Sequence, residues 1–97
     1  MTQTIKIGAI VWKVKEVPAS DIDCDTHVSG DVSSETQTIR IARGMSLEMK
    51  DLTLLHEILH CIDSELDHDL VDLLASALYQ VLKENPDMLS SLKGRVD

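Results

Sequence analysis

Two histidines and a glutamate near the middle of the chain carry its clearest chemical signal. Residues 56–60 read His-Glu-Ile-Leu-His, so the two histidines stand four positions apart with Glu57 between them. On a helix, residues four apart lie on one face, and both imidazoles can reach the same metal ion. The Glu57 carboxylate can then act as a general base, and later as an acid, toward water that the metal activates. The pattern predicts a metal site with His56 and His60 as ligands.

A third protein ligand is needed, because a catalytic zinc ion usually takes three ligands from the protein and leaves one position for water. If the motif helix ends near Ser64 and the chain reverses, the start of the next helix passes close to the two imidazoles. The residues there with ligating side chains are Glu65, Asp67, His68, Asp69 and Asp72. Spacing alone leaves the choice among them open.

The motif must sit on a helix, and the sequence predicts one over residues 47–64. Ser46 is a suitable N-cap, and Glu48 in the first turn complements the helix dipole. This segment is apolar on nearly all sides, which predicts burial between a sheet and a second helix. That second helix is expected to begin after Asp67 and to end at Asn85, because Pro86 disfavours helical geometry in the residue before it. The tail is expected to add one amphipathic turn near residues 88–92.

Two segments before the motif predict strands. Residues 4–15 are rich in β-branched side chains and partly alternate, and Pro18 ends this segment. Residues 36–41 alternate again and stop before Gly44, and a short strand near residues 26–28 is a further candidate. The expected fold is therefore α+β, with a small antiparallel sheet of two or three strands on two helices. A chain of 97 residues predicts a single domain, 1–97.

Composition excludes several classes of function. Seventeen acidic and nine basic residues give a net charge of -8, which disfavours binding to nucleic acid or to an anionic membrane. One Trp, one Tyr and no Phe leave little aromatic surface for stacking on bases. The sequence shows no transmembrane span or export signal, so we expect a cytoplasmic protein. In that compartment Cys24 and Cys61 are expected to be reduced.

Most of the chain resembles the small gluzincin-type metallopeptidase-like proteins of phages and bacteria, including minigluzincin-like forms. The specific block is residues 54–63, Leu-Leu-His-Glu-Ile-Leu-His-Cys-Ile-Asp. A softer block begins at Val71-Asp72-Leu73-Leu74-Ala75 and leads to Asn85-Pro86. The resemblance implies a minimal zincin-like fold, a Zn²⁺ cofactor and hydrolysis of a peptide or protein substrate. It also implies that the substrate pairs with an exposed strand edge, for which residues 37–41 are the candidate.

The resemblance ranks the candidates for the third ligand. The family carries an acidic ligand three residues before the Val that corresponds to Val71, and a supporting carboxylate four residues after that ligand. Here these positions hold His68 and Asp72, so the ligand position departs from the family's Glu. His68 is the first choice, with Asp69 next and Glu65 or Asp72 behind it. Asp72 is expected to accept the free ring proton of one of the motif histidines.

The sequence is compatible with three functions. The leading prediction is zinc-dependent peptide hydrolysis with Glu57 as general base. The second is a non-catalytic zinc-binding pseudo-protease that acts as a protein-interaction module. The altered third ligand favours it, as does the lack of an obvious group to steady an oxyanion, since Tyr79 lies three turns past His68 and His27 sits in a polar loop. The third is an acidic interaction protein that binds no metal.

Overall fold

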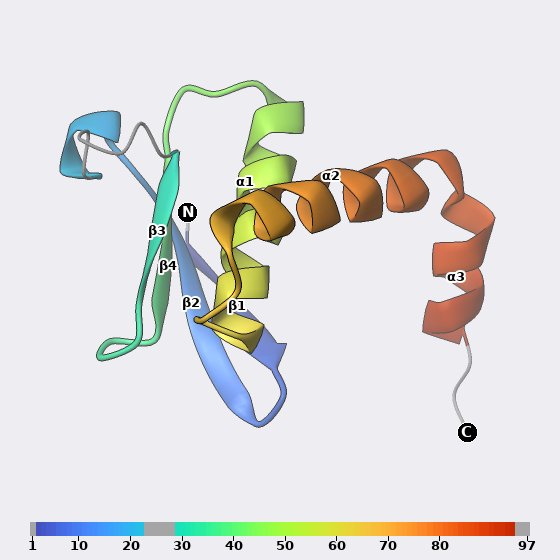
Figure 1. The fold of residues 1–97 in the computed structure, drawn as a ribbon, viewed down its shortest axis with the longest axis horizontal. Helices are drawn as coiled ribbons and strands as arrows, with labels where there is room; N and C mark the ends of the chain where they lie inside the picture. The colour runs from blue at the N-terminus through green and yellow to red at the C-terminus, as the bar shows by residue number, and fades with distance from the viewer. Residues whose placement is uncertain (1, 23–28, 95–97) are drawn as a thin grey trace.

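The computed structural model describes residues 2–22 and 29–94 of the 97-residue chain (Figure 1). Its strands are β1 (Thr2–Ile7), β2 (Ile10–Val17), β3 (Gly30–Ser33) and β4 (Thr38–Ala42), with a short 3-10 helix, η1 (Ala19–Asp21), after β2. Three helices follow, α1 (Leu47–Ile62), α2 (His68–Glu84) and α3 (Pro86–Gly94). The predicted α+β class, a small sheet packed on helices, is confirmed.

The sheet is larger than predicted and is mixed rather than antiparallel. Its strand order is β1-β2-β4-β3, and the central β2–β4 pair is parallel while the two outer pairs are antiparallel. The predicted strand over residues 4–15 is in fact a hairpin. Gly8 adopts a φ of 62°, the left-handed conformation that two-residue hairpin turns require and that glycine supplies without strain. The apolar alternation on both sides of this turn concealed it.

The strand predicted over residues 36–41 forms β4, but it is not an edge. It lies between β2 and β3, so the expectation that residues 37–41 offer an exposed edge to substrate is wrong. The edges of the described sheet are β1 and β3. The candidate strand at residues 26–28 lies outside the described residues.

Local signals set the helix boundaries. The Ser46 hydroxyl accepts a hydrogen bond from the Met49 amide at 3.2 Å and caps α1, and the Asp67 carboxylate caps α2 through the Asp69 amide at 3.1 Å. α2 ends at Glu84, as the following Pro86 predicts, and α3 is a nine-residue helix rather than a single turn. Within the residues described, no helix is long and apolar enough to cross a membrane.

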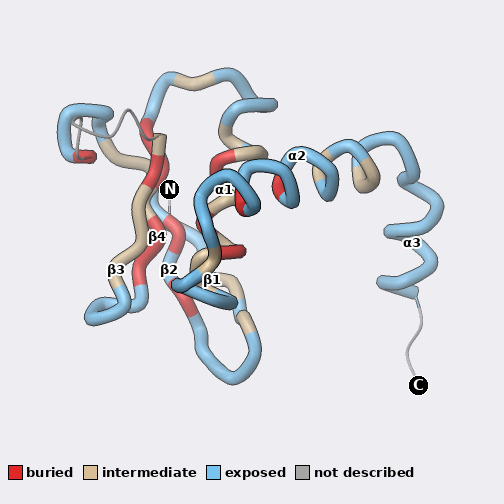
Figure 2. Tube along the Cα trace, in the orientation of Figure 1, coloured by how far each residue is buried: buried red, intermediate tan, exposed pale blue. Residues whose placement is uncertain are grey.

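Helix α1 lies between the sheet and α2, and both of its sides contribute to the core (Figures 1 and 2). On the sheet side, the buried cluster consists of Trp12, Val14, Ile39 and Ile41. On the α2 side, Leu59 packs against Val71 and Ala75. Because α1 is held from two directions, the histidine motif at its C-terminal half has a fixed position.

Candidate metal centre

The junction of α1 and α2 brings three histidines together. His56 and His60 lie one turn apart on α1, and His68 is the first residue of α2. The five residues between the helices reverse the chain, with the Asp63 side chain accepting a hydrogen bond from the Glu65 amide at 3.0 Å. One ligating nitrogen from each histidine falls in a group whose atoms all lie within 4.8 Å of one another. Two nitrogens bound to one zinc ion at about 2.0–2.1 Å stand at most roughly 4.2 Å apart, so small side-chain rotations would be needed to bring all three onto one ion.

The distance between the two motif histidines suits a tetrahedral metal. The Nε2 atoms of His56 and His60 are 3.0 Å apart. Two nitrogens bound about 2.0–2.1 Å from one tetrahedral zinc ion stand roughly 3.3 Å from each other. The His68 ring centre is 4.9 Å from that of His60 and 5.8 Å from that of His56. The donor set, three imidazoles whose ligand atoms lie within 4.8 Å of one another, is one that zinc accepts.

Asp72 holds one of the three rings in place. Its carboxylate lies 2.8 Å from Nδ1 of His56 and accepts a hydrogen bond from the Nδ1–H group. The Nε2 lone pair of His56 is then free and faces His60. Asp72 lies one turn beyond His68 on α2, which explains why a single helix delivers both a ligand candidate and its support. Of the two motif histidines, the structure assigns this support to His56.

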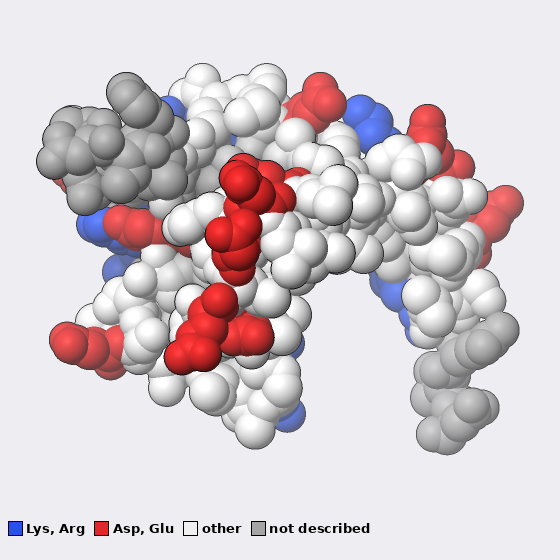
Figure 3. Space-filling model, in the orientation of Figure 1, with Lys and Arg blue, Asp and Glu red and all other residues white. Residues whose placement is uncertain are grey.

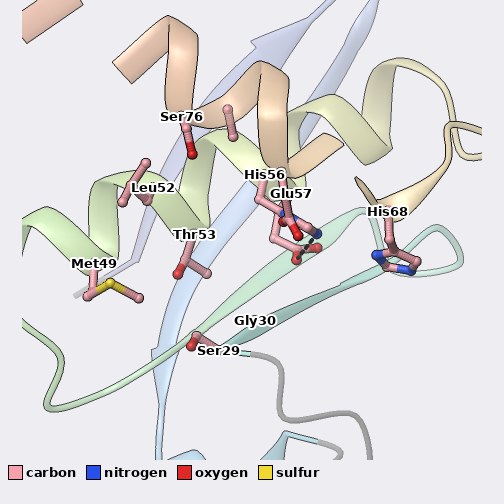
Figure 4. A pocket seen from close by; sticks show the side chains of 11 residues that line it. Ser29, Gly30, Met49, Leu52, Thr53, His56, Glu57, His68 and Ser76 are labelled. Carbon is pink, nitrogen blue, oxygen red and sulfur yellow. Dashed lines mark ion pairs between the residues drawn. The ribbon is translucent and has the colours of Figure 1, made fainter. Parts of the chain in front are cut away.

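Glu57 is buried beside the histidines. It is 5 % exposed, and its Oε1 atom lies 4.0 Å from Nε2 of His56 (Figure 4). Burial, with a smaller contribution from the negative charge of Asp31, raises the pKa of Glu57 to about 7. Burial also lowers the pKa of His60, followed by repulsion from His56 and His68 when these are charged. Both pKa shifts favour the uncharged forms of Glu57 and His60 when no metal is bound.

The site opens to solvent through two hollows. The first, of about 600 Å³, is lined on one side by apolar and small residues of α1 and α2 and on the other by the start of β3 (Figure 4). The second, of about 740 Å³, lies toward the β1–β2 hairpin and includes Ile10 and Trp12. Glu57 and His68 line both hollows. An extended molecule that occupied both would therefore pass directly over these two side chains.

Gly30 and Asp31 are parts of the site that the sequence did not indicate. A Cβ atom on Gly30 would stand 2.7 Å from the Arg40 carbonyl oxygen, 2.8 Å from Cγ2 of Thr53 and 3.4 Å from Cγ of Glu57. Only glycine therefore lets β3 approach α1 this closely. Asp31 pairs with Arg40 through two hydrogen bonds on β4. The only sign of this contact in the sequence is a glycine at the start of the strand.

The other predicted candidates lie apart from the histidine group. Asp69 and Glu65 are exposed, and neither belongs to the group of converging ligand atoms found among the described residues. Tyr79 lines a separate hollow between α1 and α2, where its hydroxyl accepts a hydrogen bond from Lys83 at 3.4 Å. His27 and Cys24 lie outside the described residues. Cys61 is a free thiol packed against the sheet-side core, and burial raises its pKa to about 11.

Comparison of the chain with protein-family models, with curated proteins and with solved structures finds no match.

Proposed function

We propose that the protein is a zinc-dependent peptide hydrolase in which His56, His60 and His68 hold the metal and Glu57 is the general base. The observation that carries the proposal is the convergence of three ligating nitrogens within 4.8 Å beside a buried carboxylate in an open pocket. Three imidazoles are a known protein ligand set for catalytic zinc, and they leave one position for water or substrate.

The chain's own residues would divide the chemistry among them. When bound, the zinc ion would act as a Lewis acid that polarises a carbonyl and lowers the pKa of water. The Glu57 carboxylate would take the proton of the attacking water and pass it to the leaving nitrogen as the peptide bond breaks. Asp72 would keep His56 in the tautomer whose Nε2 is free to bind metal.

The sheet suggests how a peptide would lie in the site. β3 is an edge strand of the sheet formed by the described residues, and its first residue, Gly30, lines the same hollow as His56, Glu57 and His68. An extended peptide can add to such an edge through main-chain hydrogen bonds. We therefore assign the substrate-binding edge to β3 in place of β4.

Peptide cleavage by metal-reconstituted protein tests the proposal. Protein loaded with one zinc ion per chain is incubated with a mixture of unstructured peptides, and the products are read by mass spectrometry. Glu57→Gln keeps the shape of the side chain but removes the base, so we expect it to bind zinc and to cleave at least about 100-fold more slowly. Equal rates for the two proteins would reject this mechanism.

One observation favours a second candidate, a non-catalytic zinc-binding protein-interaction module. No Tyr, Lys or Arg lines the described part of the first hollow, so no such side chain is placed there to steady an oxyanion. This candidate predicts tightly bound zinc, a fold that chelation melts, and no cleavage of any peptide. Elemental analysis that finds no zinc in the purified protein would exclude both candidates and leave a metal-free acidic interaction protein. For either zinc-binding candidate we propose the cytoplasm as the compartment.

A further inference from the structure

The second hollow of the metal centre, of about 740 Å³, has an apolar floor. Its apolar residues are Ile10, Trp12, Val32, Cys61 and Ile62. Trp12 is buried and Cys61 half-buried in the sheet-side core, so the packing of α1 on the sheet holds this floor in place. Ile10 and Ile62 are exposed and extend it toward solvent. A floor of this kind can pack the methylene groups of a long side chain.

Two carboxylates also line this hollow. Asp63 and Glu65 belong to the connection between α1 and α2, and both are exposed; we call them the rim carboxylates. The Asp63 carboxylate accepts a hydrogen bond from the Glu65 amide at 3.0 Å, which holds the two residues together. Acidic atoms gather over this junction of α1 and α2 in Figure 3. The hollow therefore combines an apolar floor with a negatively charged rim.

No cation of the described chain neutralises this rim. The protein has nine Lys and Arg residues, of which all but Arg95 are described. None of the other eight lines either hollow of the metal centre or forms an ion pair with a rim carboxylate. Lys13, Lys15 and Arg40 instead line a separate hollow on the sheet. The rim therefore keeps its negative charge for a ligand.

A buried carboxylate independently indicates that a ligand occupies this hollow. Glu57 is 5 % exposed, yet it lines both hollows of the metal centre (Figure 4). Within residues 2–22 and 29–94 no donor makes a hydrogen bond to its carboxylate, and Nε2 of His56 stands 4.0 Å away, too far for one. Buried polar groups normally have a partner, so the partner of Glu57 comes from a molecule in the hollow.

We propose that the second hollow is a subsite for a Lys or Arg side chain of the substrate, in a residue next to the scissile bond. The proposal rests on the proposed peptide hydrolysis, because the hollow is also lined by Glu57, His60 and His68. The methylene groups of the basic side chain pack on the apolar floor while its charged end reaches the rim carboxylates. An acidic side chain in the same place would meet like charge, which gives the site its selectivity.

Fluorescence of Trp12 tests the subsite, because Trp12 is the only Trp of the chain and lines the hollow. Zinc-loaded Glu57→Gln, in which the peptide stays uncut, is titrated with blocked alanine peptides whose central residue is Lys, norleucine or Glu. Norleucine keeps the apolar stem of Lys and lacks its charge. We expect the Lys peptide to bind at least about fivefold more tightly than the norleucine peptide, and the Glu peptide to bind most weakly. This advantage should shrink in roughly 0.5 M sodium chloride.

Removal of the rim carboxylates is the decisive comparison. In the same Glu57→Gln background, Asp63→Asn with Glu65→Gln should abolish the advantage of Lys over norleucine. The new Asn can still accept the hydrogen bond from the amide of residue 65, and circular dichroism checks the fold. Glu48→Gln with Asp51→Asn is the matched control. It removes the same charge from the separate hollow between α1 and α2, and should keep the advantage.

Cleavage of the same peptides by the zinc-loaded wild type separates this proposal from the proposed function. Cleavage with the highest kcat/KM for the Lys peptide supports both. Cleavage without any preference for Lys overturns the subsite and leaves peptide hydrolysis intact. A rim-dependent preference in binding without cleavage of any peptide supports the hollow as a site for basic side chains and rejects hydrolysis. Equal binding of the Lys and norleucine peptides, or a preference that survives removal of the rim carboxylates, overturns the subsite.

Discussion

The His56 ring is constrained at both of its nitrogens. Asp72 accepts a hydrogen bond from Nδ1, with its Oδ1 atom 2.8 Å away, and Nε2 lies 3.0 Å from the Nε2 atom of His60. A ring held at one nitrogen by a carboxylate is oriented before any ligand arrives, which lowers the entropy lost on binding. His68 is more exposed and belongs to a different helix, so its contribution depends on how α2 is placed.

Replacing the third histidine separates the two leading candidates for that ligand. We expect His68→Ala to weaken zinc binding by more than the ~10–100-fold that loss of an outer-shell partner costs. Asp69→Ala, a change at the neighbouring exposed carboxylate, is the matched control and should leave the affinity almost unchanged. Competition with a chromophoric chelator measures both. An equal loss in the two variants would contradict the assignment of His68.

Glu57 makes the stability of the metal-free protein depend on pH. Its carboxyl pKa is about 7 in the folded chain against 4.5 in its reference state. Below pH 4.5 the group is protonated in both states, and its burial costs little. Between pH 4.5 and pH 7 the unfolded chain loses this proton while the folded chain keeps it, so the free energy of unfolding falls as pH rises and levels off above 7. Glu57→Gln removes this dependence.

Urea unfolding in the presence of a chelator measures the effect. Relative to the wild type, Glu57→Gln should gain about 3 kcal/mol between pH 4.5 and pH 8, because titrations common to both proteins cancel. Glu35→Gln, a change at an exposed residue between β3 and β4, should follow the wild-type curve. Parallel curves for wild type and Glu57→Gln would show that Glu57 is not buried as described.

At the scale of elements, the site is built where three of them meet: α1, the start of α2 and the start of β3. The connection between α1 and α2 spans residues 63–67, so α2 cannot begin far from the end of α1. Their crossing is fixed by Leu59 against Val71 and Ala75. On the opposite side, Gly30 allows β3 to contact α1 next to Glu57. Each of these close approaches depends on a small side chain or a short connection.

Gly30→Ala tests the contact between β3 and α1. The added Cβ would stand 2.7 Å from the Arg40 carbonyl oxygen, and that backbone atom cannot retreat without disturbing the pairing of β3 with β4. We expect a loss of about 1–3 kcal/mol in the free energy of unfolding, measured by chemical denaturation. Gly94→Ala, where no atom lies within 4 Å of the new Cβ, should change stability by less than about 0.5 kcal/mol. Similar effects of both changes would argue against a close approach of β3.

For the whole molecule, the two halves of the fold are held together unequally. The sheet and α1 share the larger buried cluster, whereas α1 and α2 share three buried residues, Leu59, Val71 and Ala75. A metal ion bound by His56 and His60 of α1 and His68 of α2 would tie these helices together. Metal binding would then stabilise the weaker half of the molecule.

Metal removal is therefore expected to lower the thermal midpoint. Zinc at 1,000 times its dissociation constant adds about 4 kcal/mol, which for a domain of this size corresponds to more than about 10 °C. Differential scanning calorimetry with and without a chelator measures the shift. His68→Ala, which lacks the ligand on α2, should melt at nearly the same temperature under both conditions. If the chelator leaves the thermal midpoint of the wild-type protein unchanged, no metal ion links α1 to α2.

The sequence by itself determined the features that depend on near neighbours. The four-residue spacing places His56 and His60 on one face of a helix, Ser46 and Asp67 mark the starts of α1 and α2, and Pro86 marks the end of α2. Backbone geometry and capping act over about five residues, so these features follow from local order.

Only the tertiary structure decided the features that join distant segments. The strand order, the interior position of β4, the approach of Gly30 to Glu57 and the pairing of Asp72 with His56 rather than His60 all belong to this class. They depend on how α1 packs against the sheet and against α2. That packing sums many small contacts between residues far apart in sequence, and no single spacing encodes it.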